Sequence, residues 1–393
     1  MRNESVAVLD VRSYEVTFLI GAKGVNDTFV FRDGKSEKYE GYTSEGFLDV
    51  ESFRRAVISA VSSVRDNYGG VLKEISVGVP VAFTSLQTKG HTISFPSKRK
   101  ISATEVDELY ESGLKELLAK GRYMRRSEMY FALGDNRKYF SAADVYGKSS
   151  PSLKGALCYY FLDEKFYETT DGVLRELGFE EVRFIPQSLA QAEYLLPQKV
   201  REGYAFLLDM GFLSTSFSVV YGNGIVHEDS FDFGTGQIVF ALMDTFGATY
   251  ETALEILAGA DISGGIVAKE LTWTDGEGKE YSVREINETI KYCLNSLCES
   301  VENFFDKYYR GKNTANFAAN PISVTGEGVG EIRGSQEYLS KMLGRVTRVV
   351  CPDLPMFDKP VYSSRIALIS TALSEKKKKG AVRRLFQIFG GKR

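Results

Sequence analysis

The chain has 393 residues, of which 43% are hydrophobic and 26% are charged, so it is long enough for two to four domains and too apolar to be disordered or of low complexity. Residues 376–393 hold eight Lys or Arg and no acid, which leaves 41 basic and 52 acidic residues, a net charge of −11, in the rest of the chain. A body this acidic repels nucleic acid, so we expect no nucleic acid partner, and only the basic end can attract an anionic one.

Cysteine and histidine usage indicates an intracellular protein without a structural metal. The four Cys form no Cys-x-x-Cys pair and the chain has only two His, which argues against a zinc site and a disulfide framework. No apolar run approaches the roughly 18 to 20 residues that span a bilayer. Glu4 and Asp10 also interrupt any signal-peptide core. We therefore expect the chain to stay in the cytoplasm.

Two segments about 200 residues apart share one pattern. Residues 6–21 (VAVLDVRSYEVTFLIG) are an apolar strand, a polar break and an alternating strand, which predicts a hairpin with Asp10 at its bend. Residues 205–224 (AFLLDMGFLSTSFSVVYGNG) repeat this order with Asp209. The helices predicted after the two hairpins are 52–69 and 282–308. The repetition indicates two α/β halves, each with a mixed sheet.

The segment between these halves has a different pattern. Residues 80–161 contain a strand-like stretch at 88–95 and a helical stretch at 101–121 that opens on the capping sequence 102–105. Other strands are expected near 129–132, 139–146 and 156–161. We interpret this segment as an inserted α+β unit, after which a helix at 164–177 resumes the α/β pattern.

A third turn is rich in glycine. In PISVTGEGVGEIRG (321–334) an apolar strand runs into Gly326, Gly328 and Gly330 before a helix that begins near Ser335. Such turns serve tight backbone geometry as well as ligand contact. Together with two hairpins that carry an Asp, however, this turn completes the parts needed to grip a nucleotide between two lobes.

This order of parts resembles the actin, chaperone and sugar-kinase superfamily, and within it the FtsA family of bacterial cell-division proteins. The insertion at 80–161, the return segment FIPQSLAQAEYLL and the charged C-terminus carry the resemblance. It implies an α/β, actin-like two-lobed fold of duplicated mixed-sheet halves, with a small inserted α+β subdomain and a C-terminal amphipathic helix. The implied domains are a first lobe (1–83, 164–203 and 356–374), the insertion (84–163), the core of a second lobe (204–247 and 312–355), its small subdomain (248–311), and a basic linker with a membrane-targeting helix (375–393).

The resemblance also implies a nucleotide site between the lobes. It would bind ATP with Mg²⁺, the metal being held indirectly, through water, by Asp10 and Asp209. The candidate cofactor-binding residues are Asp10, Arg12, Ser13, Asp209, Gly211, Ser214, Thr215, Gly234, Gly326 and Gly328.

The phosphate-binding turns depart from the family pattern. Where the family has Asp-Ile-Gly-Thr or Asp-Ile-Gly-Ser, this chain has Arg12 in place of Gly; in the second turn Phe212 and Leu213 replace glycines, and Glu327 replaces the middle glycine of the third. Side chains with a Cβ crowd the place where phosphate oxygens would approach. We therefore expect no catalytic residue and weak or absent ATP hydrolysis.

Arg12 has three interpretations. Its guanidinium could offer donors to a terminal phosphate. It could instead pair with Asp10 or Asp209 across an empty cleft, taking the place of Mg²⁺ and locking the lobes. It could also be a plain surface arginine on a turn.

The C-terminal segment has the pattern of an interfacial helix. Along residues 381–389, apolar side chains fall on one face at 100° per residue and cations on the other. A solvated basic end and a nucleic-acid tail are the alternatives, and we expect the segment to be disordered until it meets a membrane. The residues assigned to the membrane are Lys376, Lys377, Lys378, Lys379, Val382, Arg383, Arg384, Leu385, Phe386, Ile388 and Phe389.

The resemblance implies a peripheral membrane adaptor on the inner face of the plasma membrane, at the division site. Its implied partners are the polymer-forming protein FtsZ, other copies of itself, anionic lipid and other proteins of the division machinery. One alternative is an active actin-like ATPase or small-molecule kinase. The other is a pilus-assembly actin-like ATPase, which needs no lipid-seeking helix of its own.

Overall fold

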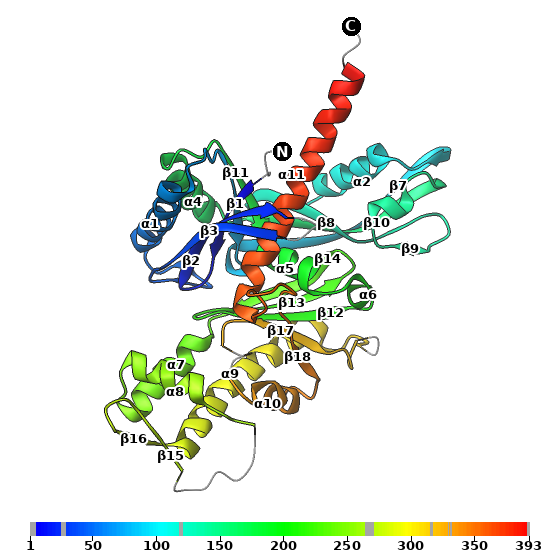
Figure 1. The fold of residues 1–393 in the computed structure, drawn as a ribbon. Coiled ribbons are helices and arrows are strands. Elements are labelled where there is room, and N and C mark those ends of the chain that lie inside the picture. The colour runs from blue at the N-terminus through cyan, green and yellow to red at the C-terminus, as the bar shows by residue number, and fades with distance from the viewer. Residues whose placement is uncertain are drawn as a thin grey trace.

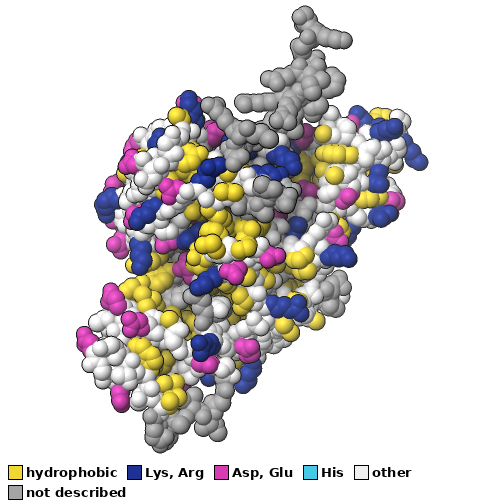
Figure 2. Space-filling model, in the orientation of Figure 1, with side chains coloured by type: hydrophobic (Ala, Val, Ile, Leu, Met, Phe, Trp, Pro, Cys, Tyr) yellow, Lys and Arg dark blue, Asp and Glu magenta, His cyan; other side chains and the backbone are white. Residues whose placement is uncertain are grey.

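The computed structural model describes residues 5–24, 29–117, 121–263, 271–314, 317–328, 330 and 332–390, with Phe29 and residues 378–390 described in their backbone only. Two lobes lie one above the other in Figure 1, with the insertion beside the upper lobe and a long C-terminal helix leaving it. Each lobe is built on a five-stranded sheet. On the face shown in Figure 2, hydrophobic side chains gather between the two lobes.

The first lobe contains a mixed sheet in the order β11-β6-β1-β2-β3. Strands β1 to β3 form an antiparallel meander, and β6 and β11 add to β1 in parallel. Helices α1 and α4 cover one face, while α5 and α11 pack against the other. The bounds are β1 Ser5–Val11, β2 Glu15–Lys23, β3 Phe29–Lys38, β4 Tyr42–Thr43, β5 Gly46–Phe47, α1 Val50–Tyr68, β6 Glu74–Val79, η2 Val81–Phe83, α4 Glu164–Glu176, β11 Glu181–Pro186, α5 Gln187–Leu195, α6 Gln198–Arg201, η3 Pro360–Tyr362 and α11 Ser363–Gly390.

The second lobe repeats this sheet strand for strand, in the order β14-β13-β12-β17-β18. Asp10 pairs with Thr17 across the first hairpin, and Asp209 pairs with Ser216 across the second. The predicted duplication is therefore confirmed. Asp10 lies within β1 rather than at the bend, which falls on residues 12–14. The strands are β12 Ala205–Met210, β13 Thr215–Tyr221, β14 Gly224–Phe231, β17 Ile322–Gly326 and β18 Thr347–Val349.

The insertion is a four-stranded sheet, in the order β7-β10-β8-β9, with α2 against one face. The predicted capping box is present, since Glu105 Oε2 accepts the Ser102 backbone N–H at 2.8 Å. The strand predicted at 139–146 is wrong after Tyr139, because the Ser141 side chain caps a short helix. The elements are β7 Thr84–Lys100, α2 Ala103–Lys115, β8 Arg122–Ala132, β9 Lys138–Tyr139, α3 Ala142–Val145 and β10 Ser149–Leu162.

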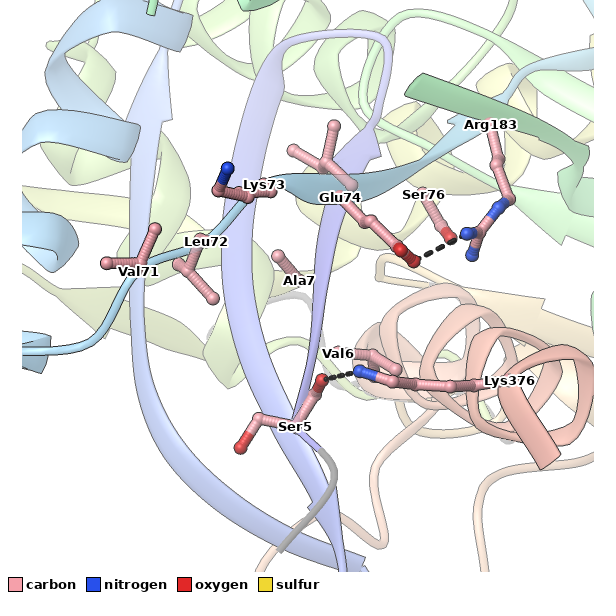
Figure 3. Close-up of a pocket in the computed structure, with 11 residues that line it drawn as sticks. Ser5, Val6, Ala7, Val71, Leu72, Lys73, Glu74, Ser76, Arg183 and Lys376 are labelled. Carbon is pink, nitrogen blue, oxygen red and sulfur yellow. Dashed lines mark hydrogen bonds and ion pairs between the residues drawn. The ribbon is translucent and has the colours of Figure 1, made fainter. Parts of the chain in front are cut away.

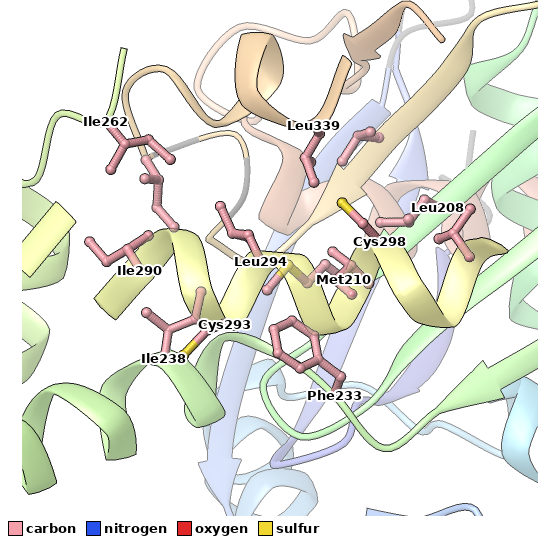
Figure 4. Packing of buried hydrophobic residues seen from close by; sticks show 14 of the residues in the cluster. Leu208, Met210, Phe233, Ile238, Ile262, Ile290, Cys293, Leu294, Cys298 and Leu339 are labelled. Carbon is pink, nitrogen blue, oxygen red and sulfur yellow. The ribbon is translucent and has the colours of Figure 1, made fainter. Parts of the chain in front are cut away.

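Helices fill the small part of the second lobe. The long helix predicted at 282–308 is α9, and its apolar stripe packs against α7, α10 and the sheet, as Figure 4 shows for Ile290, Leu294 and Cys298. A spacing of four residues puts these three side chains on one face. The elements are α7 Thr235–Phe246, α8 Tyr250–Gly259, β15 Thr272–Thr274, β16 Glu280–Ser282, α9 Val283–Tyr309 and α10 Ser335–Met342.

Helix α11 runs without a break through the segment predicted to be a linker. Its first turns bury Ile366, Leu368 and Ile369 against the first lobe. Because these packed turns already form the nucleus, the basic residues that follow extend an existing helix. Figure 1 shows the last turns projecting away from both lobes. Within the described part of the chain, none of the helices is long and apolar enough to cross a bilayer.

The membrane-binding prediction falls mostly on residues whose side chains lie outside the description. These are Lys378, Lys379, Val382, Arg383, Arg384, Leu385, Phe386, Ile388 and Phe389. Of the two residues that are described, Lys376 donates from Nζ to the Ser5 carbonyl at 2.9 Å, and Lys377 is exposed.

Candidate functional site

The turns that follow β1 and β12 meet face to face between the lobes. Arg12 Nη1 lies 2.5 Å from Asp209 Oδ2, and Arg12 Nη2 lies 2.8 Å from Asp209 Oδ1. Both side chains are buried, so this is a forked, charge-assisted pair away from water. Burial alone would lower the pKa of Arg12, but Asp209 and Glu327 raise it well above its usual range. Of the three interpretations of Arg12, the structure contains the pair that joins the lobes.

The backbone donors of the second turn are already used by the first. The Ser13 hydroxyl oxygen accepts the N–H of Leu213 at 3.0 Å and the N–H of Ser214 at 3.3 Å. Beside them the rings of Tyr14 and Phe212 stack with centroids 4.5 Å apart. The groups expected to clasp phosphate oxygens therefore hold the opposite turn instead.

The other predicted acid, Asp10, is bound by different elements, through its Oδ1 atom, whereas its buried Oδ2 accepts no hydrogen bond from the described residues. Its Oδ1 accepts Gln187 Nε2 at 2.9 Å and the Ser364 hydroxyl at 2.6 Å. Arg365 Nε lies 3.7 Å from Oδ2. Burial raises the pKa of Asp10, although Arg12 and Arg365 oppose the rise. The acid is thus enclosed by α5 and by the first turn of α11.

Two glutamines of α5 connect the two acids. Gln187 binds Asp10, and Gln191 Nε2 donates to Asp209 Oδ2 at 2.9 Å. The sequence interpretation singled out their segment but missed these residues, as it missed Tyr14 and Ser364. Their spacing of four residues on a helix that follows a strand was the available signal, because it places both amides on one face.

Helix α11 begins at the same site and contacts both lobes. Thr325 Oγ1 on β17 donates to Ser363 Oγ at 2.6 Å, while Ser364 binds Asp10 on β1. Arg365 pairs with Glu15 on β2. The first turn of this helix therefore fastens the second lobe to the first.

The predicted glycines serve close packing of the turns. Gly326 has φ +93°, and a Cβ there would lie 2.1 Å from the Met210 carbonyl oxygen. A Cβ on Gly234 would lie 2.4 Å from the carbonyl oxygens of Gly211 and Phe212. Gly328, with φ +82°, lies against Thr235. These positions require glycine because one turn approaches another, which leaves no open cradle there.

The space left between the turns is small. A cavity of about 20 Å³ is lined by residues that include Arg12, Ser13, Gln191, Asp209 and Ser214. That is room for about one water molecule. No group of three or more His, Cys, Asp or Glu among the described residues could hold a metal ion. In this arrangement the residues do not fit a nucleotide's phosphates or a metal held by the two acids.

The structure brings most of the predicted cofactor residues together. Asp10, Arg12, Ser13, Asp209 and Ser214 lie in or beside the paired turns, and Gly211 adjoins them. Thr215 begins β13, and its hydroxyl donates to the Phe233 carbonyl at 2.7 Å rather than to the paired turns. Gly234, Gly326 and Gly328 pack around the pair, as described above. We call the contacts among residues 10–14, 187–191 and 209–214 the interlobe clasp.

Comparison with known proteins establishes the fold. No family profile and no curated protein matches the sequence. A chain of the PilM-PilN type IV pilus biogenesis complex is similar in structure, with 10% identity, a TM-score of 0.61 and coverage of 94% of this chain and 98% of that one. MreB5 of Spiroplasma citri bound to AMPPNP has 11% identity, a TM-score of 0.56 and coverage of 98% and 99%. The ethanolamine utilization protein EutJ from Carboxydothermus hydrogenoformans has 12% identity, a TM-score of 0.52 and coverage of 95% and 91%. The chain thus has the predicted two-lobed actin-like fold.

Proposed function

We propose that this chain is a non-catalytic actin-like scaffold whose lobes are held closed by its own side chains. The observation that carries this proposal is the Arg12–Asp209 fork, which occupies the interlobe position expected for a metal and phosphate. A ligand entering there would have to separate a buried ion pair and supply a new partner for each charge, since either charge left buried and unpaired costs several kcal/mol. Mg·ATP is therefore not required for the closed form, and an active ATPase or kinase is disfavoured.

The scaffold attaches to membrane through the end of α11, in the manner of the FtsA family. Two features support this part of the proposal: the amphipathic, cationic pattern of residues 381–389 and the projection of this helix from the body. In this proposal the chain is cytoplasmic and peripheral on the inner face of the plasma membrane at the division site. It tethers FtsZ there, self-associates as a dimer or polymer and meets other division proteins. Several tails on one assembly would convert weak attachment into stable binding.

A second candidate is a pilus-assembly protein. It is favoured by the structural likeness to a chain of the PilM-PilN complex. This candidate has no need of a lipid-binding helix, so membrane binding by residues 378–393 separates the two.

The test is flotation on phosphatidylglycerol and phosphatidylcholine vesicles, with and without FtsZ. We expect the full chain to float and to carry FtsZ with it, and the chain lacking residues 378–393 to do neither. A full-length variant with Leu385→Gln and Phe386→Gln keeps every charge and should also fail to float, because the apolar face is lost. Equal flotation of the full and shortened chains would contradict the proposal. If the full chain floats but leaves added FtsZ behind, the proposal is restricted to membrane attachment.

A further inference from the structure

Three hollows surround α11 where it leaves the body. The first, of about 280 Å³, lies between the starts of β1 and β6 and the helix, and Figure 3 shows Arg183 and Lys376 at its edge. The second, of about 550 Å³, shares Arg183 with the first, and a third, of about 370 Å³, shares Arg125 and Glu375 with the second. The hollows are therefore contiguous. We call the residues that line them the collar.

The lining of the collar is richer in cations than the body, and acids just outside the lining, among them Glu164, Glu180 and Glu181, pair with several of these cations. Its described lining includes seven Lys or Arg and four Asp or Glu, whereas the chain before residue 376 carries a net charge of −11. Such a body is repelled by an anionic membrane surface unless it turns a basic face toward it. The lining of the hollows presents more cations than acids at the point where the helix departs.

The collar arginines are held in place with donors to spare. Arg122 lies 2.9 Å from Glu164 and 3.7 Å above the Tyr167 ring, and Arg183 Nε lies 2.8 Å from Glu181. A guanidinium has five N–H donors, and these ion pairs use one or two of them. The carboxylates fix the guanidinium planes at the edge of the hollows, and the remaining donors can bind phosphate oxygens.

A lipid headgroup is the anion that this location favours. The same helix continues directly into Lys376–Lys379 and then into the predicted membrane segment, so the collar faces whatever surface that segment enters. A hollow of about 550 Å³ is also within the range of small-ligand sites. From this juxtaposition, and resting on the membrane attachment proposed above, we infer that the collar binds the phosphate-bearing headgroups of anionic phospholipids.

The test measures partitioning of the full chain onto vesicles of phosphatidylglycerol and phosphatidylcholine, and onto vesicles of phosphatidylcholine alone. A collar variant is compared with a control that removes three cations from the second lobe, each of which makes one ion pair with a described residue. The collar variant is Arg122→Gln, Arg175→Gln and Arg183→Gln, and the control is Arg284→Gln, Lys307→Gln and Arg310→Gln. We expect about a tenfold loss of partitioning for the collar variant on anionic vesicles, and a change of less than about twofold for the control.

Three results would overturn the inference: equal partitioning of the collar variant and the control, an equal loss on neutral vesicles, or displacement of the wild-type chain from vesicles by inorganic phosphate at matched ionic strength. The last would show a free phosphate site rather than a lipid site. If the collar variant has a lowered unfolding midpoint, the double variant Lys73→Gln with Lys376→Gln is used in its place. We then expect a smaller loss of partitioning onto anionic vesicles. If removal of residues 378–393 leaves flotation unchanged, the membrane attachment proposed above is wrong. If that removal abolishes flotation and the collar variant partitions like the control, the attachment stands and only the inference about the collar is wrong.

Discussion

Asp10, near the end of β1, and Asp209, near the end of β12, occupy equivalent places in two matching sheets, yet the two acids are bound in different ways. Asp10 is bound by helices that pack on its own lobe, through Gln187 of α5 and Ser364 of α11. Asp209 is bound across the lobe boundary by Arg12. The two halves share one topology, but the groups that they place at the lobe boundary are complementary. The first half supplies the Arg12 guanidinium and the Ser13 hydroxyl. The second supplies the Asp209 carboxylate and backbone N–H donors.

This difference indicates how such a fold can close without a ligand. In a duplicated fold, two similar acidic turns repel each other unless a cation lies between them. Here a guanidinium supplies that charge and is part of the chain. Closure then depends on protein stability rather than on nucleotide concentration, and each contact of the interlobe clasp can be tested by unfolding experiments.

The largest effect should come from breaking the charged pair. Arg12→Ala leaves Asp209 buried and without its cation, so we expect a loss of about 3 to 5 kcal/mol of unfolding free energy in urea titrations. The double variant Arg12→Met with Asp209→Leu should recover most of this loss, because it removes both charges. A loss below about 1 kcal/mol for Arg12→Ala would mean that the pair does not hold the lobes together.

A further buried acid, Glu228, has no cation beside it among the residues that the structure describes. Glu228 on β14 accepts the Ser188 hydroxyl of α5 at 2.6 Å, and burial raises its pKa to about 7 although this hydrogen bond opposes the rise. The unfolded chain loses this proton near pH 4.5 and the folded chain keeps it to about 7. This group therefore makes folding less favourable as pH rises from 4.5 to 7, by about 3 kcal/mol in total.

Glu228→Gln should remove that pH dependence, because the amide stays neutral. Unfolding free energies measured across pH 4.5 to 7 should then fall less steeply for this variant than for the wild-type chain. The exposed Glu280→Gln serves as control and should keep the wild-type slope. Equal slopes for Glu228→Gln and wild type would show that Glu228 is ionised throughout.

The neutral contact of the first turn should have a smaller effect. Ser13→Ala deprives the N–H groups of Leu213 and Ser214 of their acceptor, which should cost about 1 to 3 kcal/mol. Ser63→Ala, at an exposed position of α1 where the hydroxyl donates to the Ser59 carbonyl, should cost much less. Equal costs would mean that water replaces the Ser13 hydroxyl as the acceptor for these two N–H groups.

The smallest effect should come from the stacked rings. Tyr14→Leu removes the stack on Phe212 and should cost about 0.5 to 1.5 kcal/mol in urea unfolding. Tyr14→Phe keeps the ring and loses only the hydrogen bond to Tyr250, so it should cost less than Tyr14→Leu. A loss for Tyr14→Phe as large as for Tyr14→Leu would assign the effect to the hydroxyl instead.

The sequence was informative about the fold because its patterns are local. Alternating strands around Asp10 and Asp209 indicated the duplicated hairpins, and the capping sequence at Ser102 located a helix. The clasp depends on side chains that meet across about 200 residues of chain, so Arg12 remained open to several interpretations. The continuity of α11 was missed because basic residues are weak evidence for a helix until packed residues such as Ile369 form its nucleus.

Calorimetric titration of the full, folded chain with Mg·ATP tests the central claim most directly. Because the clasp leaves a cavity of about 20 Å³ and uses the oxygens of Asp209 and the donors of the second turn, we predict no saturable binding up to millimolar nucleotide. Saturable binding of Mg·ATP with a micromolar Kd would contradict the account, since it would show that the turns open to admit the phosphates.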